Sequence, residues 1–517
     1  MAKALIFGKG RVCGVVAART AGQALRQIQR ALRYTKTIEL RLDWLANARE
    51  TAKFLTQLKK GGISRRATLL ATCRRREAGG KFSGTVVEQL SLLRFAINAG
   101  CRWVDLEIET AAGLPPFTLG LYTAQAKRIV SHHDFRETPS AARLARLGCE
   151  LDDMCGTLGF DAIKIATRCD SLANSLRVLD LARQSKDRNV IAVPMGEVVT
   201  PARVLAPRFG SVLSYAPVEG ATAPGQIPLA ELHELYRGSD VSSRTRVYAV
   251  IGDPIVHSLS PVLQNAAFRA RKMDAIYLPF RVTDLKDFLG AIEPLGIAGF
   301  SITLPHKERI LRHLDDCDPL AAAIGAVNTV VVRGGGKLFG YNTDYVGVLR
   351  AIEQRMPIAG SRVLVVGAGG AARAIALALS KGGAGVSICA RRAERARRLA
   401  RQAGGDAVPR KALKREFFDA VVNATPVGMH PNTRQSPLNA GELNCRIVFD
   451  AIYRPRRTKL LQLAAAKGIE TISGVEMFLA QGIAQWEIWS GMRAPEELMR
   501  RAVLQRLEAE ERKHKES

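Results

Sequence analysis

The chain has 517 residues, enough for two or three domains that each bury a core. Nine scattered cysteines without a C-x-x-C pair argue against disulfides and zinc and indicate the reducing cytoplasm. The net charge of +28 does not predict nucleic-acid binding, because 48 acidic residues are interleaved and no nucleic-acid-binding motif occurs. No apolar run is long and uncharged enough to span a membrane, and we expect no signal peptide.

The N-terminal part of the chain alternates between short apolar β-like runs and helix-like stretches such as 21–31, 86–99 and 172–183. Eight strands that alternate with helices predict an α/β fold, a (β/α)8 barrel, whose active site lies at the C-terminal strand ends. The expected strands are 12–17, 37–44, 67–74, 103–109, 128–134, 161–167, 190–196 and 211–217.

Lys164 interrupts the apolar run 161–167. Burying a charged lysine is costly, so burial favours the neutral amine, which can attack a carbonyl carbon. The alternative is a lysine whose amine reaches solvent at a strand end. Other polar residues gather where the expected strands end, and this favours a reactive site: Glu39, Arg41, Asp43, Arg74, Asp105, Glu107, Ser131, His132 and His133. Strand alternation sends His132 and His133 to opposite faces, so only one of them faces the barrel mouth.

Residues 10–230 resemble the type I 3-dehydroquinate dehydratases. The resemblance rests on motifs that occur in order: Glu39-x-Arg41-x-Asp43, Thr72-Cys-Arg74 with Gly79-Gly80, Asp105-x-Glu107, Ser131-x-His133-x-Phe135, Lys164-Ile-Ala, Phe209-Gly-Ser211 and Ala223-Pro-Gly-Gln226. The sequence departs from the family pattern at Ala78, Ala202, Tyr215 and Thr222, where Glu, Ser, Phe and Ser are common.

The resemblance implies a Schiff-base dehydration. Lys164 would form an imine with the substrate ketone, and His133 would remove the neighbouring proton and return one to the departing hydroxyl. Asp105 and Glu107 would orient His133, and Arg203 would bind the substrate carboxylate. The stretch 222–226 would form a mobile lid. The other implied substrate contacts are Glu39, Arg41, Arg74, Tyr215, Thr222, Ala223 and Gln226.

A polar break at 237–244 follows an expected helix at 229–236, and a new strand begins at Arg246. Ser258 and Ser260 lie two residues apart, so in an extended segment both hydroxyls face one side, as a polyhydroxylated ligand would require. The alternative is a serine-rich turn before a helix that starts at Pro261.

A glycine-rich turn, 367–373, follows the apolar run Val363-Leu-Val-Val and precedes a helical run, which is the context of a dinucleotide-binding fingerprint. Its expected cofactor contacts are Gly367, Ala368, Gly369, Gly370 and Ala371. The next strand, 385–389, is followed by Arg391, Arg392 and Arg395 rather than by an acidic residue, which favours the 2′-phosphate of NADP.

Residues 246–505 resemble the shikimate dehydrogenases, which implies two lobes with the site in the cleft between them. The motifs are G-D-P-I-x-H-S-x-S-P (252–261), G-F-S-I-T-L-P-H-K (299–307), Gly325-Ala-Val-Asn328-Thr, Asn342-Thr-Asp344, 367–373, 423–429, 450–453 and 474–477 with Gln481. The resemblance implies that Lys307 and Asp344 relay the proton to the substrate oxygen. Taken alone, Lys307 fits a solvated helix-start lysine and Asp344 a helix N-cap. The implied shikimate contacts are Ser258, Ser260, Thr303, Asn328, Asp344, Tyr453 and Gln481, and the implied nicotinamide-side residues are Ala451 and Gly474.

The sequence therefore predicts a barrel at 1–240, a substrate-binding lobe at 246–348 completed by 475–505, and a Rossmann-type NADP domain at 349–474. The expected enzyme converts 3-dehydroquinate to 3-dehydroshikimate and then, with NADPH and no metal, to shikimate. A positive field would assist the capture of these anions. Two alternatives stay open: a second half that prefers quinate, and a regulatory binding protein that reuses both folds without catalysis.

Overall fold

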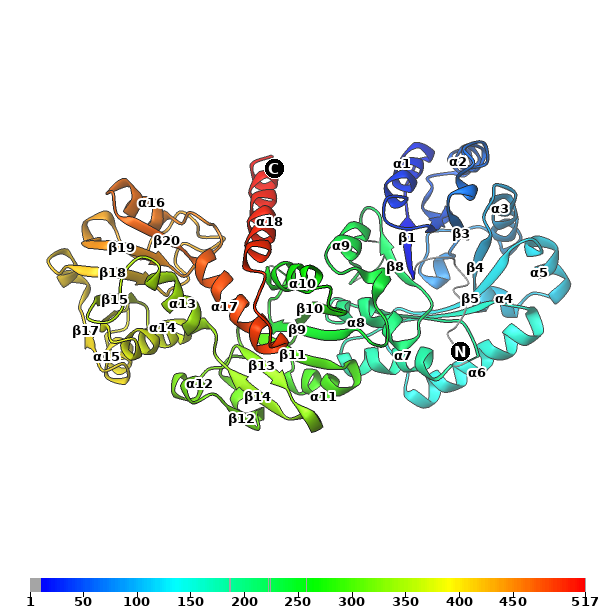
Figure 1. Ribbon diagram of the computed structural model, residues 1–517. Helices are drawn as coiled ribbons and strands as arrows, with labels where there is room; N and C mark the ends of the chain where they lie inside the picture. The colour runs from blue at the N-terminus through cyan, green and yellow to red at the C-terminus, as the bar shows by residue number, and fades with distance from the viewer. Residues whose placement is uncertain (1–10, 186, 222, 224, 257, 517) are drawn as a thin grey trace. The chain divides into compact units, whose positions relative to one another are not determined.

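The computed structural model describes residues 11–185, 187–221, 223, 225–256 and 258–516. The described residues divide into two compact units. One unit is Met1–Tyr248 with Asp274–Ile297, and the other is Ala249–Met273 with Ala298–Ser517. Three sheets carry the fold, one of eight strands and two of six (Figure 1).

The first sheet is the predicted barrel. Its strand order β7-β6-β5-β4-β3-β2-β1-β8 is that of a sheet rolled up in sequence order, and neighbouring strands in this order run parallel. The seam is bridged where Val212 N donates to Val190 O at 3.0 Å and Ala192 N donates to Ser211 Oγ at 3.1 Å. The strands are β1 (Val12–Val16), β2 (Thr37–Arg41), β3 (Thr68–Thr72), β4 (Trp103–Glu107), β5 (Lys127–Asp134), β6 (Ala162–Arg168), β7 (Val190–Met195) and β8 (Ser214–Pro217).

Helices cover the outside of these strands (Figure 1). Local capping sets several helix starts, as in the reciprocal capping boxes of Thr20 with Gln23 and of Thr85 with Glu88. Most of the strands are shorter than predicted; the largest differences arise because residues 42–44 form a 3-10 turn and β8 begins only at Ser214. The helices are α1 (Ala21–Ala31), α2 (Ala48–Lys60), α3 (Val86–Asn98), α4 (Ile108–Ala112), α5 (Pro116–Thr123), α6 (Ala141–Leu158), α7 (Leu172–Gln184), α8 (Thr200–Leu205) and α9 (Leu229–Glu234).

The second sheet has the order β10-β9-β11-β13-β14-β12. Its strands are β9 (Arg246–Gly252), β10 (Ala275–Arg281), β11 (Ile297–Ile302), β12 (Asp316–Cys317), β13 (Thr329–Val332) and β14 (Leu338–Tyr341). Its helices are α10 (Ser260–Ala270), α11 (Leu285–Leu295) and α12 (Pro319–Ile324). Helix α10 starts one residue before the expected Pro261, so Ser260 itself lies in the first helical turn.

The third sheet is parallel, with the order β17-β16-β15-β18-β19-β20. Counted from β15, this is the Rossmann order 3-2-1-4-5-6, in which a dinucleotide binds where the order reverses. Its strands are β15 (Arg362–Val366), β16 (Gly385–Cys389), β17 (Asp406–Ala407), β18 (Phe418–Asn423), β19 (Cys445–Asp450) and β20 (Glu470–Ser473).

Apolar clusters cover both faces of the third sheet. One contains Ile375 of α14 with Val363 and Val365, and the other contains Leu460 of α16 with Leu364 and Val366. The helices of this part are α13 (Asp344–Glu353), α14 (Gly370–Lys381), α15 (Ala393–Gln402), α16 (Lys459–Ala466), α17 (Gly474–Ser490) and α18 (Glu496–Glu516). Among the residues that the structure describes, no helix has the length and apolarity needed to cross a membrane.

Candidate active sites

Strand alternation places Lys164 inside the barrel. Ala162 and Ala166 of β6 belong to the apolar cluster of the barrel interior, so Lys164 between them points to the same side. Ile129 of β5 also belongs to this cluster, so His133, four residues further along that strand, points into the barrel as well. The two alanines are small and leave room around the lysine, which is only 6% exposed. The lysine is therefore buried within the barrel and does not extend into solvent.

Lys164 lies in an ion pair inside this barrel. Its Nζ is 2.9 Å from Asp105 Oδ2, 3.9 Å from Glu39 Oε1 and 4.4 Å from the centre of the Tyr215 ring. The carboxylate of Asp105 offsets part of the cost of burying Lys164, and the neutral amine expected from the sequence stays a prediction. Burial alone would raise the pKa of Asp105, but Arg74 and Lys164 together bring it below its usual value.

His133 is contacted by an arginine rather than by a carboxylate. Its Nδ1 lies 2.7 Å from an Nη of Arg74, and its ring stacks on Phe135 at 6.0 Å. Burial and the nearby charges of Arg74 and Lys164 lower the pKa of His133 well below its usual value, so the imidazole is neutral. His132 instead has Glu109, Asp134 and Glu150 among its charged neighbours, so the two histidines face opposite ways as alternation predicts.

The expected orientation of His133 by Asp105 and Glu107 is wrong for the structure. Asp105 accepts hydrogen bonds from Lys164, Arg74 and Ser131. Glu107 accepts from the backbone N of Arg75 and from Gln89 Nε2. The reason is steric as well as electrostatic, since the Arg74 side chain lies between Asp105 and the imidazole and binds both.

The Gly79-Gly80 motif lies against these residues. Gly79 has a φ of 76°, and a Cβ there would lie 2.2 Å from the Phe135 ring. A Cβ on Gly80 would lie 2.0 Å from the carbonyl O of Arg74. Only glycine allows the turn to pack this closely against the residues that contact His133.

Three other expected substrate residues of the barrel are Glu39 and Arg41, which bond to neighbouring side chains, and Arg203, whose burial lowers its pKa. Glu39 accepts from Thr72 Oγ1 at 2.7 Å, and Arg41 forms a two-point pair with Asp43 at 2.9 and 2.8 Å. Arg203, on α8, is buried, and burial lowers its pKa to about 10, a penalty that an anionic ligand would reverse.

The expected lid is described only in part. Ala223 packs against the interior cluster of the barrel, and its backbone N donates to Gln226 Oε1 at 3.1 Å. Thr222 lies outside the described residues.

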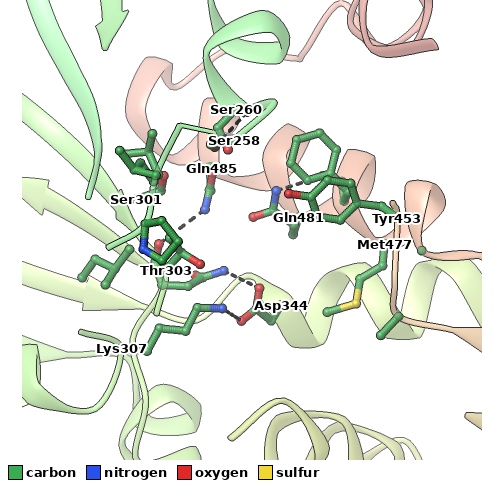
Figure 2. A pocket seen from close by; sticks show the side chains of 18 residues that line it. Ser258, Ser260, Ser301, Thr303, Lys307, Asp344, Tyr453, Met477, Gln481 and Gln485 are labelled. Atoms are coloured by element: carbon green, nitrogen blue, oxygen red, sulfur yellow. Dashed lines mark hydrogen bonds and ion pairs between the residues drawn. The ribbon is translucent and has the colours of Figure 1, made fainter. Parts of the chain in front are cut away.

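A second site is a cavity of about 270 Å³ in the other unit. Figure 2 shows Lys307 and Asp344 on one side of it and Ser258 and Ser260 on the other. The structure therefore brings together ten residues that the sequence predicted for substrate, nicotinamide or catalysis: Ser258, Ser260, Thr303, Lys307, Asn328, Asp344, Ala451, Tyr453, Gly474 and Gln481.

Lys307 and Asp344 form an ion pair in this cavity. Lys307 Nζ is 2.6 Å from Asp344 Oδ2, while Asn328 Nδ2 donates to Asp344 Oδ1 at 2.8 Å (Figure 2). Asn328 Oδ1 accepts from the backbone N of Thr343 at 2.7 Å, which fixes the orientation of the amide. Asp344 is the first residue of α13 rather than its N-cap, because Thr343 holds that position. The pair can hold and move a proton at the cavity wall.

Sequence reasoning missed Gln485, which also lines the cavity (Figure 2). It is 2% exposed, and its Oε1 has no hydrogen-bond partner among the described residues. Its Nε2 makes only a long contact, 3.4 Å, with Asn328 O. Gln485 lies four residues after Gln481 on α17, so helix periodicity places both on one face and could have identified it.

The glycine-rich turn lies where the strand order of the third sheet reverses. Gly367 N donates to Cys389 O and Ala424 N to Val366 O, so the turn is flanked by the ends of β16 and β18. Gly369 is the N-cap of α14, whose N-terminus is suited to a pyrophosphate. Arg373, in the first turn of α14, forms an ion pair with Glu308 at 2.7 Å.

Two further features fit a dinucleotide that carries a 2′-phosphate. The side chains of Arg391, Arg392 and Arg395 are exposed beside β16 and have no ion pair within the described ranges. A Cβ on Gly474 would lie 2.6 Å from the carbonyl O of Ala451, so this wall of the cavity is bare backbone. Both features leave the space and the charge that NADP needs.

Four family models together match most of the chain. The type I 3-dehydroquinase model matches residues 12–243, and the shikimate dehydrogenase substrate-binding domain model matches 250–330. The shikimate/quinate 5-dehydrogenase model matches 350–433, and the shikimate 5'-dehydrogenase C-terminal domain model matches 474–504.

One relative matches both halves of the chain, and others match about half of it. The bifunctional 3-dehydroquinate dehydratase/shikimate dehydrogenase of Arabidopsis thaliana, a chloroplastic protein, is 36% identical over 89% of this chain and 78% of its own length. The shikimate dehydrogenase (NADP(+)) of Methanosarcina acetivorans is 45% identical over 51% of this chain and 99% of its own. The crystal structure of shikimate 5-dehydrogenase from Thermus thermophilus with NADP(H) and shikimate is 36% identical, covers 50% of this chain and 98% of that chain, and has a TM-score of 0.47.

The match to the Arabidopsis protein spans both halves, and in each half the lysine that the motifs singled out forms an ion pair with an aspartate, Lys164 with Asp105 and Lys307 with Asp344. The chain therefore belongs to the bifunctional 3-dehydroquinate dehydratase/shikimate dehydrogenase family.

Proposed function

We propose that the chain catalyses two consecutive reactions. The barrel dehydrates 3-dehydroquinate to 3-dehydroshikimate, and the second half reduces 3-dehydroshikimate to shikimate with NADPH. The observation that carries this proposal is the presence of both reactive pairs in one chain, Lys164 with His133 and Lys307 with Asp344. We assign the barrel to residues 1–240, the substrate lobe to 246–348 with 475–505, and the NADP domain to 349–474.

In the barrel, Lys164 forms the imine. Lys164 reacts as the free amine, and the hydrogen bond to Asp105 at 2.9 Å orients its Nζ. The amine then attacks the ketone carbon, and water leaves as the imine forms. Arg203 pairs with the substrate carboxylate, while Glu39, Arg41 and the 222–226 segment contact its hydroxyls.

His133 carries the elimination. The imine acidifies the neighbouring carbon, and the neutral imidazole takes its proton. The imidazolium returns a proton to the departing hydroxyl, which leaves as water. A second water then hydrolyses the imine and frees Lys164.

In the second half, the wall formed by Lys307 and Asp344 supplies the proton. NADPH, when bound, supplies the hydride for the ketone carbon. Lys307 donates a proton to the resulting oxygen, and Asp344 holds the ammonium in place at 2.6 Å. The serine pair Ser258 and Ser260 binds the other end of the substrate, with Tyr453 and Gln481.

NADP is the proposed cofactor because the arginines after β16 are free to pair with a phosphate. Arg391, Arg392 and Arg395 face no acidic partner among the described residues, whereas NAD would favour a carboxylate there. The Methanosarcina relative is named for NADP(+), which agrees with this assignment. The turn residues Gly367, Ala368, Gly369, Gly370 and Ala371 would hold the pyrophosphate.

Quinate is the second candidate substrate for the reductase half, because the matching family model is described for both shikimate and quinate. A regulatory binding role without catalysis is disfavoured, because a binder has no need of two intact proton-transfer pairs. We place the protein in a reducing compartment, the cytoplasm, since all nine cysteines are free.

Borohydride trapping tests the covalent step. The full chain is mixed with 3-dehydroquinate, treated with sodium borohydride and digested, and the peptides are analysed by mass spectrometry. We expect the reduced adduct on Lys164 and on no other lysine. The Lys307→Ala variant should label as strongly as the wild type, whereas an adduct on another lysine would refute the assignment.

A further inference from the structure

Arg74 connects the two reactive groups of the barrel. Its Nη1 lies 2.7 Å from His133 Nδ1, and its Nη2 donates to Asp105 Oδ1 at 2.9 Å. Asp105 in turn receives Lys164 Nζ on its other oxygen at 2.9 Å. A continuous chain of hydrogen bonds therefore runs from the amine through a carboxylate and a guanidinium to the imidazole. Arg74 is only 3% exposed, so solvent competes little for these bonds.

The contact between Arg74 and His133 determines the tautomer of the histidine. A guanidinium has only hydrogen-bond donors, so Nδ1 of His133 must be the acceptor. A neutral imidazole that accepts at Nδ1 carries its hydrogen on Nε2. The one ring nitrogen with a lone pair is then already engaged, and the other nitrogen is a donor.

This tautomer constrains how His133 works as a base. The ring takes a carbon-bound proton only at Nδ1, and that atom lies behind the Arg74 guanidinium. We propose that Arg74 is a positioning residue that caps His133, and that substrate binding draws the guanidinium off Nδ1 before the proton is removed. This inference deepens the proposed role of His133 and rests on it.

The proton balance of the cycle follows from this arrangement. The substrate carbon gives its proton to Nδ1, which produces an imidazolium with hydrogens on both nitrogens. The proton on Nδ1 then goes to the departing hydroxyl, which leaves as water, and the free Nδ1 of the neutral ring again accepts from Arg74. The substrate's own oxygen atoms are the acceptors that compete for Nη1, while Nη2 keeps its bond to Asp105 as a pivot.

The charges around the imidazole determine the pH dependence. Arg74 from the segment after β3, Lys164 from β6, Arg41 from β2 and His132 from β5 all act on His133. All four are cationic or become so at low pH, and with burial they lower the pKa of His133. Arg74 has the largest of these electrostatic effects and is the only one in direct contact.

The test uses the full chain labelled with 15N-histidine, whose protonated and unprotonated ring nitrogens have well-separated NMR signals. His133→Asn identifies the His133 signals by their loss. At neutral pH without substrate we expect hydrogen on Nε2.

In Arg74→Met the ring should populate both tautomers, and in Arg74→Lys the charge stays but the two-point geometry is lost. Addition of 3-dehydroquinate to the Lys164→Ala chain should shift Nδ1 as the cap leaves.

Arg41→Met is the matched control, because it removes a cation of the same site that does not touch the imidazole. Its His133 should keep the Nε2 hydrogen. In Arg74→Met the acid limb of kcat/KM for dehydration should move to higher pH by about one unit, and in Arg41→Met by less. Shikimate dehydrogenase activity and circular dichroism verify that each variant is folded.

The proposal that Arg74 caps His133 would be refuted by hydrogen on Nδ1 in the wild type. It would also be refuted by an unchanged tautomer and pH profile in Arg74→Met. A different result would refute the proposed role of His133 as the base. If His133→Ala kept full dehydratase activity, the base assignment would be lost even though the tautomer remained as described.

Discussion

The cost of burying a lysine can be offset by different partners, and the group that pairs with the amine influences its reactivity. Here Asp105 pairs with Lys164 and with Arg74 at once, so two cations share one carboxylate. Burial lowers the pKa of His133, and the nearby charges of Arg74 and Lys164 lower it further. The interior of the barrel thus holds a neutral base in the same site as the amine of Lys164.

Tyr215 stands where Phe is common in the family, and its hydroxyl has no hydrogen-bond partner among the described residues. An unsatisfied buried hydroxyl is destabilising by about 1 kcal/mol or more. We therefore expect Tyr215→Phe to stabilise the barrel by about 1 kcal/mol, measured on its unfolding transition. The ring next to Lys164 remains, so the dehydratase kcat should change less than about twofold. A tenfold loss of kcat would show that the hydroxyl acts on the substrate.

Gln485 has an unused carbonyl oxygen that lines the reductase cavity. Gln485→Leu keeps the size of the side chain but removes the amide, so we expect the KM for 3-dehydroshikimate to rise about tenfold, equivalent to about 1.4 kcal/mol. The kcat should stay nearly constant, because Lys307 and Asp344 are untouched. Gln264→Leu is the control, since Gln264 also has an unpaired Oε1 but does not line the cavity. Equal effects of both changes would contradict a substrate contact by Gln485.

At the scale of elements, the strand pattern was enough to predict much of the site. Residues of equal parity on β6, β5 and β4 face the barrel interior together, so Lys164, His133 and Asp105 could be grouped from the sequence. The partner of each side chain could not be predicted. Arg74 follows β3 on a short turn, and its direction depends on the close packing of Gly79 and Gly80 rather than on any periodicity.

The same limit applies to the second half. Motif order predicted Lys307 beside Asp344, but Gln485 belongs to no quoted motif and had to be found on its helix face. The sequence pattern also predicted the strands better than it predicted their ends, as the 3-10 turn at 42–44 within an expected strand shows. Buried polar contacts depend on side-chain directions across several elements, and a pattern along one element does not contain them.

We propose that the segment between β16 and α15 determines the cofactor preference. Replacing Arg391 and Arg392 with alanine removes two free cations, so we expect the KM for NADPH to rise at least tenfold while the KM for NADH changes little. Arg397→Ala is the matched control, because it removes an exposed arginine from another side of α15. Initial rates with both cofactors measure the effect. Parallel losses for NADPH and NADH would contradict recognition of the 2′-phosphate.

At the scale of the whole molecule, the net charge of +28 accompanies two sites for anionic ligands. Long-range attraction raises the rate of encounter and is screened within about 8 Å at physiological salt. We expect kcat/KM of both reactions to fall as sodium chloride is raised from low to high concentration, with kcat nearly constant. A kcat/KM that does not depend on salt would show that the charge serves another purpose.

The central claim is that two independent sites act in sequence on one chain, and a coupled assay tests it most directly. The purified wild type is given 3-dehydroquinate and NADPH, and products are separated by chromatography. We predict shikimate from the wild type, no reaction from Lys164→Ala with 3-dehydroquinate but normal reduction of added 3-dehydroshikimate, and accumulation of 3-dehydroshikimate by Lys307→Ala. Loss of both activities in either folded variant would contradict the account.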